Sequence, residues 1–351
     1  MSEFWSDVVH TLSPYVPGEQ PRGGSFVKLN TNENPFGPSP ATLEAIRAAV
    51  TDRLRLYPDP ESLALRTAIA ERFGLEAAEV FVGNGSDEVL AHTFHALLKH
   101  GEPLLFPDIT YSFYPTYCRL YEIPHRLTPL DANLRLRVED YVAPRGAIII
   151  ANPNAPTGVA LPLEDVRRLV TAHADRMVVV DEAYVDFGAQ SAASLVRDHA
   201  NLLVVRTFSK SHSLAGMRVG FALGQRHLIE ALVRVKDSFN SYPLNMLSQA
   251  AALAAWLDKD WTDQCLAKIV ANRAELTQAL AGLGFDVLPS QANFVFAALP
   301  GRAGADLMRL LREEGVLVRH FSAPRIADRL RITIGTADEC AALVAALRRR
   351  L

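Results

Sequence analysis

Residues 202–220 read LLVVRTFSKSHSLAGMRVG, and this stretch decides the fold. Its first four residues form an apolar run that predicts a buried strand. Ser209 and Lys210 follow where that strand would end, and Arg218 comes next, between two glycines. A lysine just beyond a buried strand is partly desolvated, which favours the neutral amine that forms imines. The Ser209 hydroxyl and the Arg218 guanidinium suit a phosphate, although an exposed Ser-Lys pair with an unrelated arginine is the alternative.

Similar apolar runs occur on both sides of this stretch. They cover residues 80–82, 104–106, 147–151, 177–180 and 219–223. Segments with helical character, such as residues 86–99, separate them. Short apolar strands alternating with helices predict an α/β fold, in which helices cover both faces of a mostly parallel central sheet. Ligands of such sheets bind at the carboxyl ends of the strands.

The pattern changes after residue 245. Longer helical segments at residues 247–257 and 265–283 precede shorter strands and helices that continue to residue 351. A chain of 351 residues suits two packed domains. We therefore predict an N-terminal arm (residues 1–29), a large domain (30–245) and a smaller C-terminal α/β domain (246–351).

An acidic residue follows the run at residues 177–180. Asp181 stands at the predicted strand end, and Tyr184 comes three residues later. A carboxylate there can pair with a protonated ring nitrogen and keep a heteroaromatic ring electron-withdrawing. Tyr184 is placed to hydrogen-bond a hydroxyl on the same ring. The alternative for Asp181 is a helix cap.

Two further turns follow predicted strands. In residues 83–86, Gly-Asn-Gly-Ser, glycines open a helix whose backbone N–H groups suit an anion. In residues 152–158, Asn-Pro-Asn-Ala-Pro-Thr-Gly, rigid prolines place Asn154 at a strand end. Alone, each fits an ordinary capped or proline-rich turn. Together with Lys210 and Asp181, they predict one site for a phosphorylated cofactor.

The composition narrows the class of protein. Apolar residues make up 49% and the net charge is −3, which argues against a general nucleic-acid binder. No apolar run approaches the roughly 20 residues that cross a bilayer, and residues 1–15 do not resemble a signal peptide. The three cysteines lie far apart, and His92 with His95 lacks a third ligand. We expect a cytoplasmic protein without a metal site.

The chain resembles a known family. Its Ser-Lys-x5-Gly-x-Arg-x-Gly motif (residues 209–220) resembles the signature of fold-type-I, pyridoxal-phosphate-dependent aminotransferases of the aspartate aminotransferase superfamily. Five other segments resemble the histidinol-phosphate aminotransferases in particular. They are Leu-Ser-Pro-Tyr at 12–15, Asn-Glu-Asn-Pro at 32–35, Tyr-Pro-Asp at 57–59, Asp-Glu-Ala-Tyr-x-x-Phe at 181–187 and Leu-Arg-Ile-Thr-x-Gly-Thr at 330–336.

The resemblance implies pyridoxal 5'-phosphate as cofactor and gives each residue a role. The implied catalytic residues are Lys210, which carries the cofactor as a Schiff base and moves the proton, Asp181 at the ring nitrogen and Tyr184 at the ring hydroxyl. The other cofactor-binding residues are Tyr111, which stacks on the ring, and Gly85, Ser86, Ser209 and Arg218, which hold the phosphate. Tyr57 reaches that phosphate from a second subunit, and Asn154 is the candidate for a further contact to the ring hydroxyl. The substrate residues are Tyr15, Asn34, Arg319 and Arg331.

One position departs from the family pattern. The family places an asparagine immediately before Pro-Thr-Gly, where it contacts the cofactor ring hydroxyl, and this chain has Ala155 there. Either Asn154 takes over that contact or Tyr184 makes it alone. For Arg319, the alternative to substrate binding is a surface ion pair with Glu313 or Glu314.

The function that the resemblance implies is transamination between histidinol phosphate and glutamate in histidine biosynthesis, with imidazole acetol phosphate and 2-oxoglutarate as the keto partners. It also implies a homodimer with shared active sites and small-molecule substrates. Three alternatives stay open: an aromatic amino acid aminotransferase, a threonine-phosphate decarboxylase, and a non-enzymatic sensor of amino compounds. The sensor would carry a DNA-binding domain, for which we find no room before residue 30. The sequence leaves the preferred amino donor undecided.

Overall fold

A seven-stranded sheet forms the centre of the large domain. The structure, a computed structural model, describes residues 2–15, 18–21, 23, 25–142 and 145–351. The strand order is β2-β8-β7-β6-β5-β3-β4. The strands are β2 (Val80–Asn84), β3 (Leu104–Pro107), β4 (His125–Thr128), β5 (Ile148–Ala151), β6 (Val178–Asp181), β7 (Leu202–Thr207) and β8 (Val219–Leu223). Strand β8 runs antiparallel to both neighbours, and the other neighbouring pairs are parallel.

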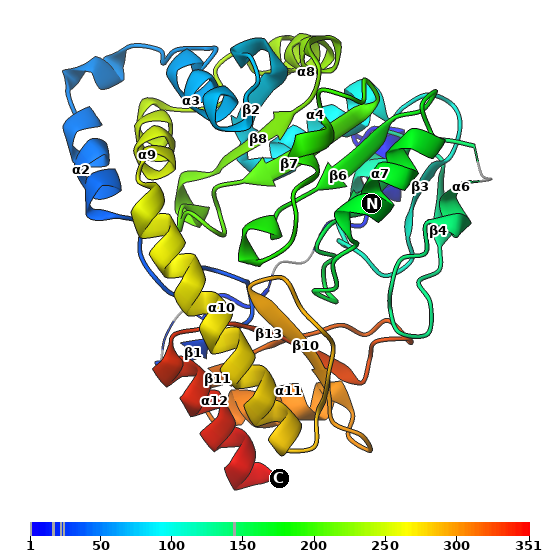
Figure 1. Ribbon diagram of the computed structural model, residues 1–351, viewed down its shortest axis with the longest axis vertical. Coiled ribbons are helices and arrows are strands. Elements are labelled where there is room, and N and C mark those ends of the chain that lie inside the picture. The colour runs from blue at the N-terminus through cyan, green and yellow to red at the C-terminus, as the bar shows by residue number, and fades with distance from the viewer. Residues whose placement is uncertain (1, 16–17, 22, 24, 143–144) are drawn as a thin grey trace.

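Helices cover both faces of this sheet (Figure 1). Because side chains alternate along a strand, Val178 and Val180 pack on one face with α3, α7 and α9, while Val179 packs on the other with α4, α5 and α8. Each fully buried aliphatic side chain contributes roughly 1.5–3 kcal/mol. The helices are α2 (Pro40–Ala49), α3 (Leu63–Phe73), α4 (Gly85–Leu97), α5 (Tyr114–Leu120), α6 (Glu139–Val142), α7 (Leu163–Ala172), α8 (Arg226–Phe239) and α9 (Met246–Leu257). Short 3-10 helices are η1 (Asp52–Arg55), η2 (Ala77–Glu79), η3 (Val185–Phe187), η4 (Ala192–Leu195) and η5 (Ala215–Met217).

The smaller domain lies at the carboxyl-terminal end of the long helix α10 (Figure 1). It contains an antiparallel sheet of order β12-β13-β10-β9 and a parallel pair, β1 with β11. Its strands are β1 (Val27–Lys28), β9 (Asp286–Val287), β10 (Phe294–Ala298), β11 (Val316–Leu317), β12 (Arg319–His320) and β13 (Arg329–Thr333). Its helices are α10 (Lys259–Gly282), α11 (Gly304–Glu313) and α12 (Ala337–Arg350).

The packing favours domain boundaries that differ from those predicted. Helix α9 contributes Ala251 and Trp256 to the core of the large domain, so the division falls after α9 rather than before it. Residues 27–29, which we assigned to the arm, join the smaller domain, because β1 pairs with β11 and Leu29 lies in that core. The apolar residues of α9 could not show from the sequence alone whether the helix packs on the sheet of the large or of the smaller domain.

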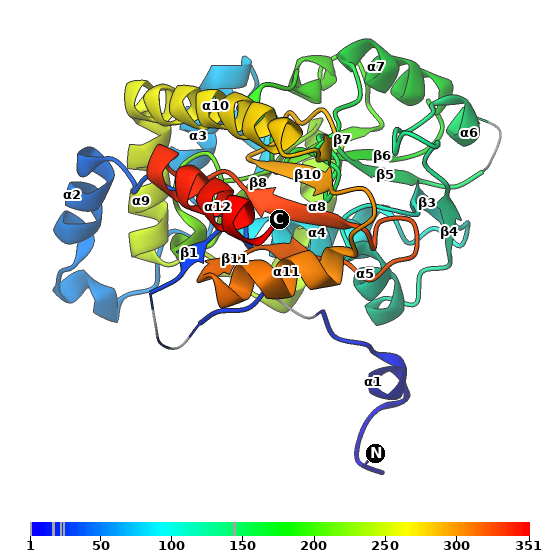
Figure 2. The same cartoon turned by 90° about the horizontal axis from the view of Figure 1, so that it is seen from below.

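The first residues project from the body of the protein, as Figure 2 shows for α1 (Asp7–Thr11). The segment that follows returns to the large domain. Arg119 of α5 donates a hydrogen bond to the Ser13 carbonyl at 3.2 Å, and the rings of Tyr15 and Phe113 lie 5.1 Å apart. Within the described residues, no helix combines the length and apolar character that crossing a membrane requires.

Candidate active site

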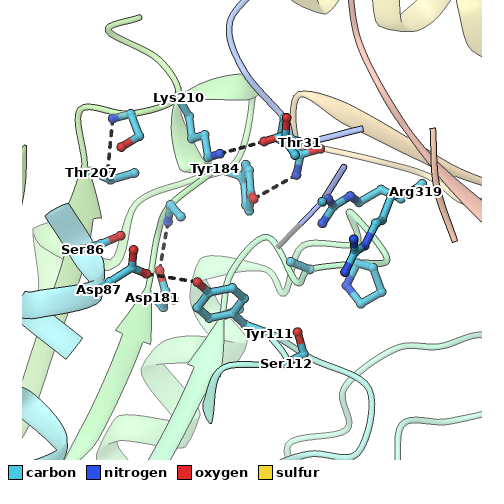
Figure 3. A pocket seen from close by; sticks show the side chains of 18 of the residues that line it. Thr31, Ser86, Asp87, Tyr111, Ser112, Asp181, Tyr184, Thr207, Lys210 and Arg319 are labelled. Atoms are coloured by element: carbon cyan, nitrogen blue, oxygen red, sulfur yellow. Dashed lines mark hydrogen bonds between the residues drawn. The ribbon is translucent and has the colours of Figure 1, made fainter. Parts of the chain in front are cut away.

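A cavity of about 220 Å³ lies at the carboxyl ends of the parallel strands, between the two domains. Its lining comes from the N-terminal segment, the start of α4, the ends of β6 and β7, and strands β12 and β13. Ten of the residues predicted from the sequence line it: Tyr15, Ser86, Tyr111, Asp181, Tyr184, Ser209, Lys210, Arg218, Arg319 and Arg331. Figure 3 shows several of them pointing toward one another.

Lys210 lies just beyond β7, as predicted. Its Nζ donates a hydrogen bond to the Thr31 carbonyl at 3.2 Å and lies 5.9 Å from the centre of the Tyr184 ring (Figure 3). The Asn34 amide donates to the carbonyls of Lys210 and Ser211, at 3.0 and 3.3 Å. Asn34 therefore holds the backbone of the lysine segment, and it is not among the residues that line the cavity.

Asp181 ends β6 and is buried. Its Oδ2 accepts a hydrogen bond from the Tyr114 hydroxyl at 2.9 Å, and its Oδ1 accepts one from the Ala183 amide at 3.2 Å. Burial raises the pKa of Asp181 to about 6, although the Tyr114 hydrogen bond opposes this rise. Among the described residues Asp181 forms no ion pair, so the carboxylate suits a cation supplied by a ligand.

The start of α4 and Arg218 form a tight anion site. Gly85 has a φ of +76°, and a Cβ there would lie 2.5 Å from the Arg218 guanidinium. Arg218 donates to Asp87 at 2.8 Å and to the Ser209 hydroxyl at 3.4 Å. Asp87 also accepts a hydrogen bond from the Tyr111 hydroxyl at 3.1 Å (Figure 3). The helix N-terminus, the hydroxyl and the guanidinium together fit a phosphate.

Two arginines from the smaller domain face the other end of the cavity. Arg319 of β12 and Arg331 of β13 are direct partners in the antiparallel register. Arg331 is half-buried. It donates a hydrogen bond to the Asn30 carbonyl at 3.1 Å, and its Nε has no hydrogen-bond partner among the described residues. Burial lowers the pKa of Arg331, and the nearby charge of Arg319 adds to this effect. Such a pair is suited to an anion.

The alternative partners of Arg319 are engaged elsewhere. Glu314 pairs with Arg349 at 2.7 Å and with Arg350 at 3.1 Å. Glu313 pairs with Arg350 at 2.7 Å. Arg319 instead lies 5.7 Å from the centre of the Phe321 ring and lines the cavity. The two glutamates therefore bind the C-terminal arginines of α12.

Asn154 does not reach this cavity. Its amide donates to the Ile109 carbonyl at 3.0 Å and to the Thr157 hydroxyl at 3.1 Å, so both of its hydrogens are used. Its oxygen accepts a hydrogen bond from Thr110. Ala155 lines the cavity beside Tyr184, whose hydroxyl accepts a hydrogen bond from an asparagine of the N-terminal segment. In this arrangement Asn154 does not take over the contact missing at Ala155, and the contact of Tyr184 to a ring hydroxyl stays a prediction.

Tyr57 also lies outside the cavity of its own chain. It precedes α3 and is 79% exposed, and its ring stacks on Tyr242 with centroids 4.6 Å apart. Other large apolar side chains, Leu54, Leu56 and Phe239, are also exposed in this chain. The predicted role of Tyr57 requires a second subunit and stays a prediction.

Sequence reasoning missed four residues of the site. Thr31 and Asn32 hold Lys210 and Tyr184, and Asp87 bridges Arg218 and Tyr111. Tyr114 holds Asp181. Asp87 could have been suspected, because it follows the predicted anion turn directly. Asn32 begins the Asn-Glu-Asn-Pro segment, but that pattern gave it no role, and no local pattern assigned one to Thr31 or Tyr114.

The donor set has three parts that match one cofactor: an amine, a buried carboxylate without a cation, and an anion site at a helix N-terminus. They fit the aldehyde, the pyridine nitrogen and the phosphate of pyridoxal phosphate. The fold and site thus define a pyridoxal-phosphate-dependent enzyme of fold type I. The model of the family "Aminotransferase class I and II" matches residues 25–347, and the chain belongs to this family.

Individual relatives agree with this assignment. Histidinol-phosphate aminotransferase 1 of Bradyrhizobium diazoefficiens is 62% identical over 348 residues, which cover 99% of each chain. Histidinol-phosphate aminotransferase 2 of Rhizobium meliloti is 63% identical over 347 residues, again 99% of each. The crystal structure of histidinol-phosphate aminotransferase from Sinorhizobium meliloti in complex with pyridoxal-5'-phosphate gives a TM-score of 0.88 at 26% identity, covering 100% of this chain and 99% of that one. The predicted fold class, cofactor and enzyme class are confirmed.

Proposed function

We propose that this chain is a histidinol-phosphate aminotransferase of histidine biosynthesis. It moves an amino group between histidinol phosphate and 2-oxoglutarate, with imidazole acetol phosphate and glutamate as the products. The two relatives of that name, at 62% and 63% identity, support the proposal.

The observation that carries the substrate assignment is the pairing of Arg319 with Arg331. Like charges directly opposite in a sheet destabilise each other, so an anion between them is favoured. A phosphate has more charge and more acceptor oxygens than a carboxylate, and it suits two guanidinium forks better. Tyr15 lines the same cavity and adds a hydroxyl donor. A carboxylate of glutamate can use the same arginines in the other half of the reaction.

The residues of the chain divide the work. Bound pyridoxal phosphate supplies an electron sink for the negative charge that develops at the substrate carbon. Lys210 Nζ takes the proton from the substrate carbon that bears the amino group. Asp181 holds the ring nitrogen protonated, and Tyr184 orients the ring through its hydroxyl. The arginine pair fixes the anionic end of the substrate, which holds that proton within reach of Lys210.

The test compares catalytic efficiency for histidinol phosphate, histidinol and phenylalanine in the wild type and in Arg319→Ala. Each contact to a charged group contributes about 1.5–3 kcal/mol, so Arg319→Ala should lower efficiency for histidinol phosphate roughly tenfold to a hundredfold. Efficiency for histidinol should change much less. Arg329→Ala is the matched control, because Arg329 lies on the neighbouring strand β13 of the same sheet but pairs with Asp286 at 2.7 Å.

Three outcomes would contradict the assignment. If histidinol is used as well as histidinol phosphate, or if Arg319→Ala impairs all three donors equally, the phosphate is not recognised and the aromatic aminotransferase reading takes its place. Release of carbon dioxide from threonine phosphate, without a keto product, would instead indicate the decarboxylase. Carbon dioxide and the keto product can be measured with the same enzyme preparations.

The exposed apolar surface around Tyr57 supports a homodimer. Tyr57, Tyr242 and Phe239 are large side chains that a lone chain would leave in water. We propose that a second copy covers them, and that Tyr57 then reaches the phosphate site of that copy. Shared active sites would follow from this arrangement.

A cytoplasmic location completes the proposal. Cys118, Cys265 and Cys340 are buried and unpaired. Buried thiols without disulfides are typical of a reducing compartment. Small-molecule amino donors and keto acids are the partners that this location supplies.

A further inference from the structure

Tyr114 has a position that the sequence did not single out. It is the first residue of α5, its side chain is fully buried, and its ring lies 5.5 Å from that of Tyr111 and 5.9 Å from that of Phe106. From there its hydroxyl donates to Asp181 Oδ2 at 2.9 Å. Three aromatic contacts, including Phe94 at 6.0 Å, fix the ring and therefore the direction of the hydroxyl.

The hydroxyl completes the environment of the carboxylate. Asp181 Oδ1 is held by the Ala183 amide, so the two donors fix both oxygens and leave the carboxylate one orientation. Among the described residues, Tyr114 gives Asp181 its only side-chain hydrogen bond. Burial and the adjacent Asp181 charge raise the pKa of Tyr114 well above its ordinary value, so its hydroxyl keeps its proton and always donates.

We propose that Tyr114 is a positioning residue of the reaction: its hydroxyl keeps Asp181 charged and aimed at the cofactor ring nitrogen. The inference rests on the role proposed for Asp181. A carboxylate and a pyridine nitrogen compete for one proton, and a donor to the carboxylate stabilises its ionised form. The proton therefore stays on the ring, where it is needed for electron withdrawal. The nearby Asp87 carboxylate repels the negative charge on Asp181. The hydrogen bond from Tyr114 therefore matters more for keeping Asp181 ionised.

The test removes one hydroxyl and leaves the ring. Tyr114→Phe deletes the hydrogen bond to Asp181. Tyr117→Phe is the matched control, because Tyr117 lies on the same helix, is also buried, and donates only to the Asp87 backbone carbonyl at 2.8 Å. Both variants are reconstituted with pyridoxal phosphate labelled with ¹⁵N in the ring. The nitrogen chemical shift then reports ring protonation directly, independently of turnover.

Loss of one hydrogen bond to a charged group shifts the equilibrium of the proton between Asp181 and the ring nitrogen by roughly tenfold to a hundredfold. Tyr114→Phe should move the nitrogen signal toward the unprotonated position and lower kcat about tenfold or more, with KM for the donor little changed. Tyr117→Phe should match the wild type in both. A Tyr114→Phe spectrum identical to the wild type, or equal losses in the two variants, would overturn the proposal.

A second variant keeps the test decisive if Tyr114→Phe does not fold. Incorporation of 3-fluorotyrosine at position 114 retains the ring and strengthens the hydroxyl as a donor. The nitrogen signal should then stay at the protonated position to a higher pH than in the wild type, and an unchanged or lower pH would contradict the role. The wild-type spectrum alone tests the role of Asp181: an unprotonated nitrogen there refutes that assignment, not merely the part of Tyr114.

Discussion

Removing the charge of Asp181 should remove a pH-dependent loss of stability from the cofactor-free protein. Burial raises the pKa of Asp181 from 3.8 to about 6. Between these values the folded protein binds a proton that the unfolded chain does not, so stability falls as pH rises through this window. The difference is about 2 pH units, and each is worth about 1.4 kcal/mol, so the ionised carboxylate costs about 3 kcal/mol above pH 6. Asp181→Asn lacks this cost.

The assay is urea unfolding of cofactor-free wild type and Asp181→Asn at pH 4 and pH 8. From pH 4 to pH 8 the stability of the variant relative to the wild type should rise by roughly 2–3 kcal/mol, because only the wild type ionises a buried carboxyl. An asparagine has one acceptor oxygen for the two donors, Tyr114 and Ala183, and this loss is the same at both pH values. With pyridoxal phosphate bound, the wild type should be the more stable protein at pH 8, since the carboxylate gains a cationic partner. Turnover of the variant should fall severely. A stability difference between variant and wild type that stays the same from pH 4 to pH 8 without cofactor would refute the reasoning.

Two further predictions concern the phosphate site and the dimer. Gly85→Ala should weaken pyridoxal phosphate binding about tenfold or more, because its Cβ would lie 2.5 Å from Arg218 at a φ of +76°. Gly216→Ala, which meets no atom within 4 Å, should bind the cofactor normally, and equilibrium dialysis of both variants decides this. Mixing an inactive Tyr57→Ala protein with Lys210→Ala should restore part of the activity, because each heterodimer keeps one intact site. A fully active monomer by sedimentation would exclude this arrangement.

The strand ends of the large domain could be predicted because their chemistry is local. An apolar run followed by Asp181 or by Ser209 and Lys210 shows both the strand and the group it presents. The orientation of β8 could not be predicted, because an apolar run looks the same in either direction. The place of α9 was also missed, since its apolar face could cover either sheet.

The second layer of the site depends on tertiary packing. Tyr114 meets Asp181 across 67 positions in the sequence, and Asn32 meets Tyr184 across 152. No periodicity joins such pairs. Arg319 and Arg331 were predicted separately, but only the strand register places them opposite each other. The sequence also could not show where the Asn154 amide points, because its two hydrogens are taken by Ile109 and Thr157 in the folded chain.

The central claim, that Lys210 carries the cofactor, has a direct measurement. The holoenzyme is reduced with sodium borohydride and digested, and the peptides are mapped by mass spectrometry. We expect a phosphopyridoxyl group on Lys210, and none in the Lys210→Ala protein, whose fold should be intact by circular dichroism. A reduced label on any other lysine of the wild-type protein would contradict the assignment.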